Sequence, residues 1–96
     1  MLKHVVFMKF KQGVSDAAVA DLQAGLGGLP SAVSEIRGFQ FGRDILHSER
    51  SYDFALVADF DDLDAMKRYQ VHPAHVAVLG KVRQICDATV VVDFSF

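Results

Sequence analysis

The chain has 96 residues, a formal net charge of −2 at pH 7 and one cysteine. This length predicts a single domain over residues 1–96. The ten basic residues are scattered, which argues against a nucleic-acid site, and no apolar run approaches the roughly 20 residues that span a bilayer. A single cysteine cannot form an internal disulfide, so we expect a cytoplasmic protein.

The first half of the chain predicts two strands with a helix between them. Residues 2–10 are apolar and strand-like. Ser15 is a suitable N-cap for a helix over residues 16–26, because its hydroxyl can accept from a free backbone N–H. The Gly-Gly-x-Pro segment at residues 27–30 predicts the end of this helix. A second strand is predicted over residues 36–43.

The second half predicts two further strands and a broken helix. Residues 52–60 form the third strand, and a short helix follows that ends at Arg68. A second helical segment begins at Pro73 and runs to about Cys86, and residues 89–94 form the last strand. The order β-α-β-β-α-β predicts a ferredoxin-like α+β fold with an antiparallel four-stranded sheet.

Both faces of the predicted sheet are apolar. In the first strand, His4, Val6 and Met8 share one face, and Val5 and Phe7 share the other. The helices of a ferredoxin-like domain cover only one face, and hydrophobic residues make up 51% of this chain, so the second cover has to come from outside it. We therefore expect a homodimer through the sheet faces, with a small-molecule cavity on the open face of each sheet.

The segment from Tyr69 to His75 reads Tyr-Gln-Val-His-Pro-Ala-His and carries the strongest chemical signal. Pro73 predicts a sharp turn there and a new helix, with His72 as its cap. His75 shares a helical face with Leu79, so burial should lower its pKa and keep a neutral imidazole available as a base. The alternatives are a core histidine bonded to a carbonyl, and for Tyr69 an aromatic that only packs.

His4 lies in an apolar strand, where a polar side chain needs a hydrogen bond or costs about 1–3 kcal/mol. Its partner can be the backbone, Tyr69 or a ligand. We expect the pocket to be lined by His4, Val6, Met8, His72, Leu22, Leu26 and Leu79.

No metal or cofactor is predicted for this site. His72 and His75 are three residues apart, but the turn between them breaks the helical register, and no cysteine or carboxylate stands at ligand spacing. The sequence also contains neither a G-x-G-x-x-G motif nor a phosphate-binding loop.

With these residues in view, the chain resembles the stress-responsive A/B barrel (Dabb) family. The resemblance rests on Lys3-His-Val-Val with Lys9-Phe-Lys, on Gly42-Arg-Asp, on Tyr52-Asp-Phe and above all on the motif from Tyr69 to His75. It implies a ferredoxin-like α+β domain, two copies of which form a dimeric α/β barrel.

One plant enzyme similar to this family closes a polyketide by aldol condensation without a cofactor. The resemblance places its catalytic histidine on His75, its catalytic tyrosine on Tyr69 and its pocket histidine on His4. It implies that His75 removes a proton from a methylene between carbonyls while Tyr69 polarises a carbonyl oxygen. That enzyme's aromatic residues on the first helix are replaced here by residues such as Leu22 and Leu26.

Three functions follow as hypotheses. The first is cofactor-independent acid/base chemistry, of the aldol cyclase or lyase type, on a small carbonyl compound. The second is a ligand-binding or stress-protective protein without turnover. The third is a small monooxygenase that uses no cofactor.

Overall fold

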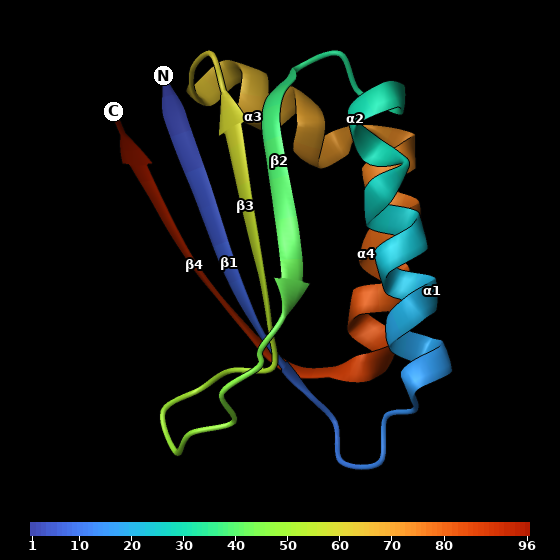
Figure 1. The fold of residues 1–96 in the computed structure, drawn as a ribbon. Helices are drawn as coiled ribbons and strands as arrows, with labels where there is room; N and C mark the ends of the chain where they lie inside the picture. Colours follow the sequence, from blue (N-terminus) through green and yellow to red (C-terminus); the bar gives the residue numbers. More distant parts are fainter.

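The computed structural model describes all 96 residues, and its elements follow the predicted order with one addition. They are β1 (Leu2–Phe10), α1 (Asp16–Gly27), α2 (Leu29–Ala32), β2 (Ile36–Arg43), β3 (Phe54–Phe60), α3 (Leu63–Val71), α4 (Pro73–Ile85) and β4 (Cys86–Ser95). The strands form one antiparallel sheet in the order β2-β3-β1-β4. The helices lie on one side of it, and the two termini lie side by side (Figure 1). The predicted ferredoxin-like α+β fold is confirmed.

The predicted start of α1 and its end at the two glycines are confirmed, and a short helix that the sequence did not predict follows it. The Ser15 hydroxyl accepts a hydrogen bond from the Ala18 N–H at 3.1 Å, as an N-cap does. Pro30 does not end the helical structure, because it lies in the first turn of the short helix α2. Its missing N–H costs nothing at that position, since no helical carbonyl is available to it there.

Three predicted boundaries are shifted. Helix α3 continues to Val71 instead of ending at Arg68, and the His72 N–H donates to the Tyr69 carbonyl at 3.1 Å. Tyr69 is therefore a helical residue. Strand β3 begins at Phe54 and not at residue 52. Strand β4 begins at Cys86, directly after α4, and not at residue 89.

The two faces of the sheet have different environments. The face toward the helices contributes Leu2, Val6 and Met8 of β1 to a core that also contains Val19, Leu22 and Leu26 of α1 and Val78 and Val82 of α4. No helix covers the other face (Figure 1). Apolar side chains nevertheless remain exposed there: Phe7 by 44%, Val90 by 42% and Val92 by 63%. The longest helix, α4, has 13 residues, and no helix is long and apolar enough to cross a membrane.

Candidate functional site

A cavity of about 260 Å³ lies between the sheet and the helices. Its polar lining consists of His4, Tyr69, Gln70, His75 and Thr89; the apolar lining consists of Val6, Met8, Leu26, Leu56, Val78, Leu79, Val82 and Val91. The prediction that these groups would lie on the open face of the sheet is wrong. His4, Val6 and Met8 alternate toward the helix side of β1, so the cavity that they line is on the covered face.

His75 is positioned by the break between α3 and α4. The ring lies in the first turn of α4, and Nδ1 donates to the Gln70 carbonyl at 3.0 Å. In the neutral ring this bond leaves Nε2 without a proton and able to accept one. Burial lowers the pKa of His75, and repulsion from His4 lowers it further, while the bond to Gln70 acts in the opposite direction. A neutral imidazole with one free nitrogen is a competent general base.

Tyr69 brings a phenol to the same cavity. It is 1% exposed, and its ring centroid lies 4.3 Å from that of His75 and 4.9 Å from that of Phe60. Burial raises the pKa of Tyr69 to about 12. The hydroxyl therefore keeps its proton at neutral pH and can donate a hydrogen bond to a carbonyl or enolate oxygen.

His4 is held by a carboxylate that sequence reasoning did not identify. Its Nδ1 lies 2.5 Å from Oδ1 of Asp93, and the two residues face each other in the β1–β4 register. His4 is 7% exposed and lines the cavity, so this bond satisfies a buried ring nitrogen. The contact spans 89 residues of sequence. Only the strand register could have pointed to it.

Two of the seven residues expected to line the pocket do not line it. Leu22 is fully buried in the core. His72 caps α4, as predicted, because its Nδ1 accepts from the Ala74 N–H at 3.1 Å. The structure brings the other five together, with His75 and Tyr69, and adds Leu56, Gln70, Val78, Val82, Thr89 and Val91.

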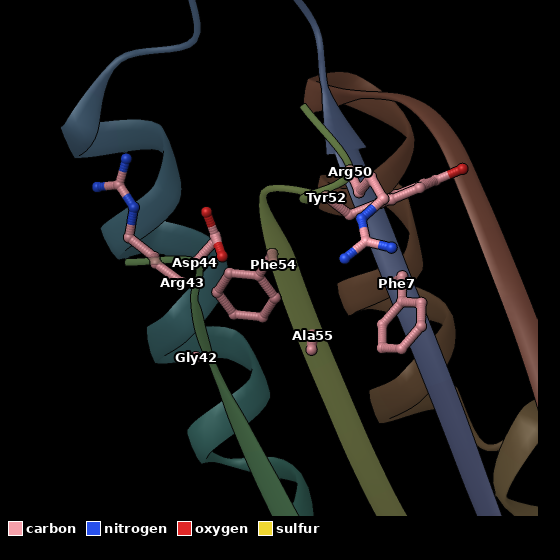
Figure 2. A pocket seen from close by; sticks show the side chains of 8 residues that line it. All are labelled: Phe7, Gly42, Arg43, Asp44, Arg50, Tyr52, Phe54 and Ala55. Carbon is pink, nitrogen blue, oxygen red and sulfur yellow. The ribbon is translucent and has the colours of Figure 1, made fainter. Parts of the chain in front are cut away.

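A separate depression of about 280 Å³ lies where β2 and β3 approach the connection between them (Figure 2). It is lined by Phe7, Gly42, Arg43, Asp44, Arg50, Tyr52, Phe54 and Ala55. Arg43 points toward α1 in this view, where its Nη1 donates to Asp16 at 3.0 Å. None of His4, Tyr69 and His75 reaches this depression, so it shares no proposed acid/base group with the cavity.

No group of three or more His, Cys, Asp or Glu side chains is arranged to hold a metal ion. Burial, with Asp53 and Asp87 nearby, raises the pKa of Cys86. The half-buried thiol therefore stays protonated at neutral pH, and a protonated thiol is a poor nucleophile.

The fold and the cavity define a small ferredoxin-like α+β protein with a pocket between its sheet and its helices. The model of the Stress Responsive A/B Barrel Domain (Dabb) matches residues 2–96, and the chain belongs to this family.

Three relatives illustrate the range of the family. The stress-response A/B barrel domain-containing protein HS1 of Arabidopsis thaliana is 29% identical over 98% of this chain and 88% of its own length. A dimeric ferredoxin-like protein of unknown function from Thermobifida fusca YX, known from a crystal structure, is 32% identical in sequence. The match has a TM-score of 0.91 and covers 99% of this chain and 90% of that chain. Olivetolic acid cyclase of Cannabis sativa is 21% identical over 98% of this chain and 95% of its own length.

Proposed function

We propose that the cavity is a small-molecule site in which His75 acts as a general base on a carbonyl compound. The observation that supports this most is the pairing of His75 with Tyr69 at one cavity: the base has a free Nε2, and the phenol keeps its proton. The two rings come from different helices and lie 4.3 Å apart. Such a fixed pair fits the geometry that proton transfer requires.

The chemistry follows from these two groups. Nε2 of His75 takes a proton from a methylene between two carbonyls, and the electron pair of the broken C–H bond moves onto a carbonyl oxygen as an enolate. The Tyr69 hydroxyl donates a hydrogen bond to that oxygen. The enolate carbon then forms a bond to the carbon of a further carbonyl of the same molecule, one that does not flank the methylene. The π electrons of that carbonyl move to its oxygen, which takes the proton back from His75.

His4 has a supporting role in this proposal. Asp93 holds its Nδ1, so the ring is fixed at the cavity wall. The cavity lining contains neither lysine nor arginine, so the compound that fits it best is a neutral ketone or ester. The match with olivetolic acid cyclase over nearly the whole chain agrees with carbonyl chemistry.

Deuterium exchange tests the base role. Methyl acetoacetate in D₂O exchanges its central methylene protons, which NMR follows directly. We expect the protein to accelerate this exchange and His75→Ala to lose about 10²- to 10⁴-fold of the acceleration. His47→Ala, in the exposed connection between β2 and β3, is the matched control and should keep the full rate.

A different result would favour the second hypothesis. Binding of the ester without any accelerated exchange would make the protein a ligand-binding or stress-protective protein. Equal exchange by the wild type and His75→Ala would show that the base is not His75.

We also propose that the protein is cytoplasmic and that it forms a homodimer through the open faces of its sheets. The exposed apolar side chains of that face support the homodimer, as does the dimeric state of the Thermobifida fusca protein. Val92→Lys would place a charge within such an interface and should shift the mass in solution from dimer to monomer. Val76→Lys is the control, because Val76 is similarly exposed, by 53%, but lies on α4. A mass unchanged by Val92→Lys would exclude this interface.

A further inference from the structure

The helix layer covers β1 but stops short of β4. Met8 and Val6 are 3% and 8% exposed, whereas Val91, which faces Val6 in the register, is 49% exposed. Thr89, opposite Met8, is exposed as well. Thr89 and Val91 line the cavity. The cavity is therefore open to the outside along β4.

A groove continues the cavity at this opening. It has a volume of about 320 Å³ and includes Arg83, Cys86, Asp87 and Ala88 at its outer part. The cavity and the groove share three lining residues: Leu79, Val82 and Thr89. The two spaces thus meet between α4 and β4.

The shared residues show how the cavity and the groove are arranged along α4. His75, Leu79 and Val82 follow one another along α4, and Val82 lies about 10 Å beyond His75 at 1.5 Å per residue. His4, Tyr69 and His75 line the cavity and not the groove. The proposed acid/base groups therefore lie at one end of a path, and the groove lies at the other.

The chemistry of the path changes along its length. Polar side chains gather at the His75 end, and Leu79, Val82 and Val91 form the middle. Arg83 and Asp87 at the outer end have opposite charges, so the exit does not select for a charged group. The cavity alone is smaller than the roughly 300 Å³ at which ligand pockets usually begin. Together, the cavity and the groove exceed this volume.

We infer that this site takes carbonyl compounds that bear a linear apolar tail, with the tail leaving between α4 and β4 along Leu79, Val82 and Thr89. The inference rests on the proposed function for the position of the carbonyl head. It places the tail away from α1, whose only residue at the cavity is Leu26. The open end of the groove allows the tail to vary in length.

A homologous series of esters tests the path. Methyl acetoacetate, methyl 3-oxohexanoate and methyl 3-oxooctanoate share one head group and differ only in the length of the tail. Titration of the full-length protein, followed by calorimetry or NMR, gives a dissociation constant for each. We expect the affinity to rise about two- to fourfold for each added methylene, as burial of a methylene predicts.

Two variants locate the tail. Thr89→Trp fills the junction and Arg83→Trp fills the outer groove. Thr89 is an exposed residue of β4 on the face toward the helices, and Arg83 is an exposed residue of α4 that lines only the groove. Both should reduce the gain in affinity per methylene to below about 1.5-fold for the longer esters. Val76→Trp, on an exposed part of α4 that lines neither space, should leave the whole series unchanged.

The outcomes separate this inference from the proposed function. Equal affinity for all three esters, or a chain-length dependence that survives in both tryptophan variants, would overturn the tail path, even if His75 catalyses exchange of the shortest ester. A chain-length dependence that both variants abolish would support the path, even if no exchange is catalysed.

Discussion

The rings of Tyr69 and His75 lie with their centroids 4.3 Å apart and their planes inclined by 44°. Tyr69 is in the last part of α3 and His75 in the first turn of α4. The two helices are separated only by His72, whose extended backbone ends the first and whose side chain caps the second. The sequence of the break thus sets the distance between the proposed base and the proposed donor.

The pKa of His75 predicts a pH profile. Burial lowers this pKa below 6.5, so protonation removes the base only at a pH lower than in a free histidine. We expect the rate of catalysed exchange to stay level from pH 8 down past 6.5 and to fall only at lower pH. The dependence of kcat/KM on pH, which reports the free protein, measures this midpoint. A midpoint above 6.5 would contradict the burial of the ring.

Substitutions of Tyr69 should distinguish a role of its hydroxyl in the reaction from a role of its ring in packing. Its ring contacts Phe60 and His75 in the core, whereas its hydroxyl has no hydrogen-bond partner within the chain. Tyr69→Phe keeps the ring, so we expect a change of less than about 1 kcal/mol in unfolding free energy and a fall of about tenfold or more in exchange rate. Tyr69→Ala removes the ring and should cost about 3–5 kcal/mol.

The comparison of the two variants is the informative result. Chemical denaturation gives the stability and NMR exchange gives the rate. If Tyr69→Phe exchanged at the wild-type rate, the phenol would have no part in the reaction and Tyr69 would serve only the core.

Asp93 should act through His4. We expect Asp93→Ala to lower the exchange rate by about 10- to 100-fold, because His4 would lose the group that orients it. Asp93→Asn keeps an acceptor at the same position and should recover part of this loss. The unfolding free energy of Asp93→Ala should fall by about 1–3 kcal/mol, because the buried Nδ1 of His4 loses its hydrogen-bond partner, and Asp93→Asn should lose less.

A double variant checks whether the two residues form one unit. His4→Ala combined with Asp93→Ala should be no slower than His4→Ala alone. Asp64→Asn, at an exposed position of α3 that lines neither the cavity nor the groove, is the control and should keep the wild-type rate. Additive losses in the double variant would mean that Asp93 acts independently of His4.

Local signals in the sequence were enough to predict most of the fold. The cap at Ser15, the start of α4 at Pro73 and the extent of β1 depend on neighbouring residues and agree with the structure. Pro30 was misread because a proline suits the first turn of a helix as well as the segment after one.

The site was predicted only in part, because some of its contacts join neighbouring residues and others join residues far apart in the sequence. Tyr69 and His75 are close in the sequence, so their proximity could be inferred, whereas the bond between His4 and Asp93 joins the two ends of the chain. The side of the sheet that holds the cavity was missed because both faces are apolar. Alternation along a strand shows which residues share a face but not which face the helices cover.

Gly38 and Gly42, both in β2, should respond differently to the same substitution. A Cβ at Gly38 would lie 2.6 Å from Oδ2 of Asp59 and 3.3 Å from its Cγ, whereas a Cβ at Gly42 would meet nothing within 4 Å. Rotation of the Asp59 carboxylate alone does not relieve this contact, because the added Cβ would also lie 3.4 Å from Cβ of Asp59. Gly38→Ala should therefore lower the unfolding free energy by about 1–2 kcal/mol. Gly42→Ala should leave it unchanged or raise it by up to about 1 kcal/mol, because alanine reduces the entropy of the unfolded chain. Urea denaturation of the two variants at one protein concentration measures the difference, and equal stabilities would mean that Asp59 does not pack against Gly38.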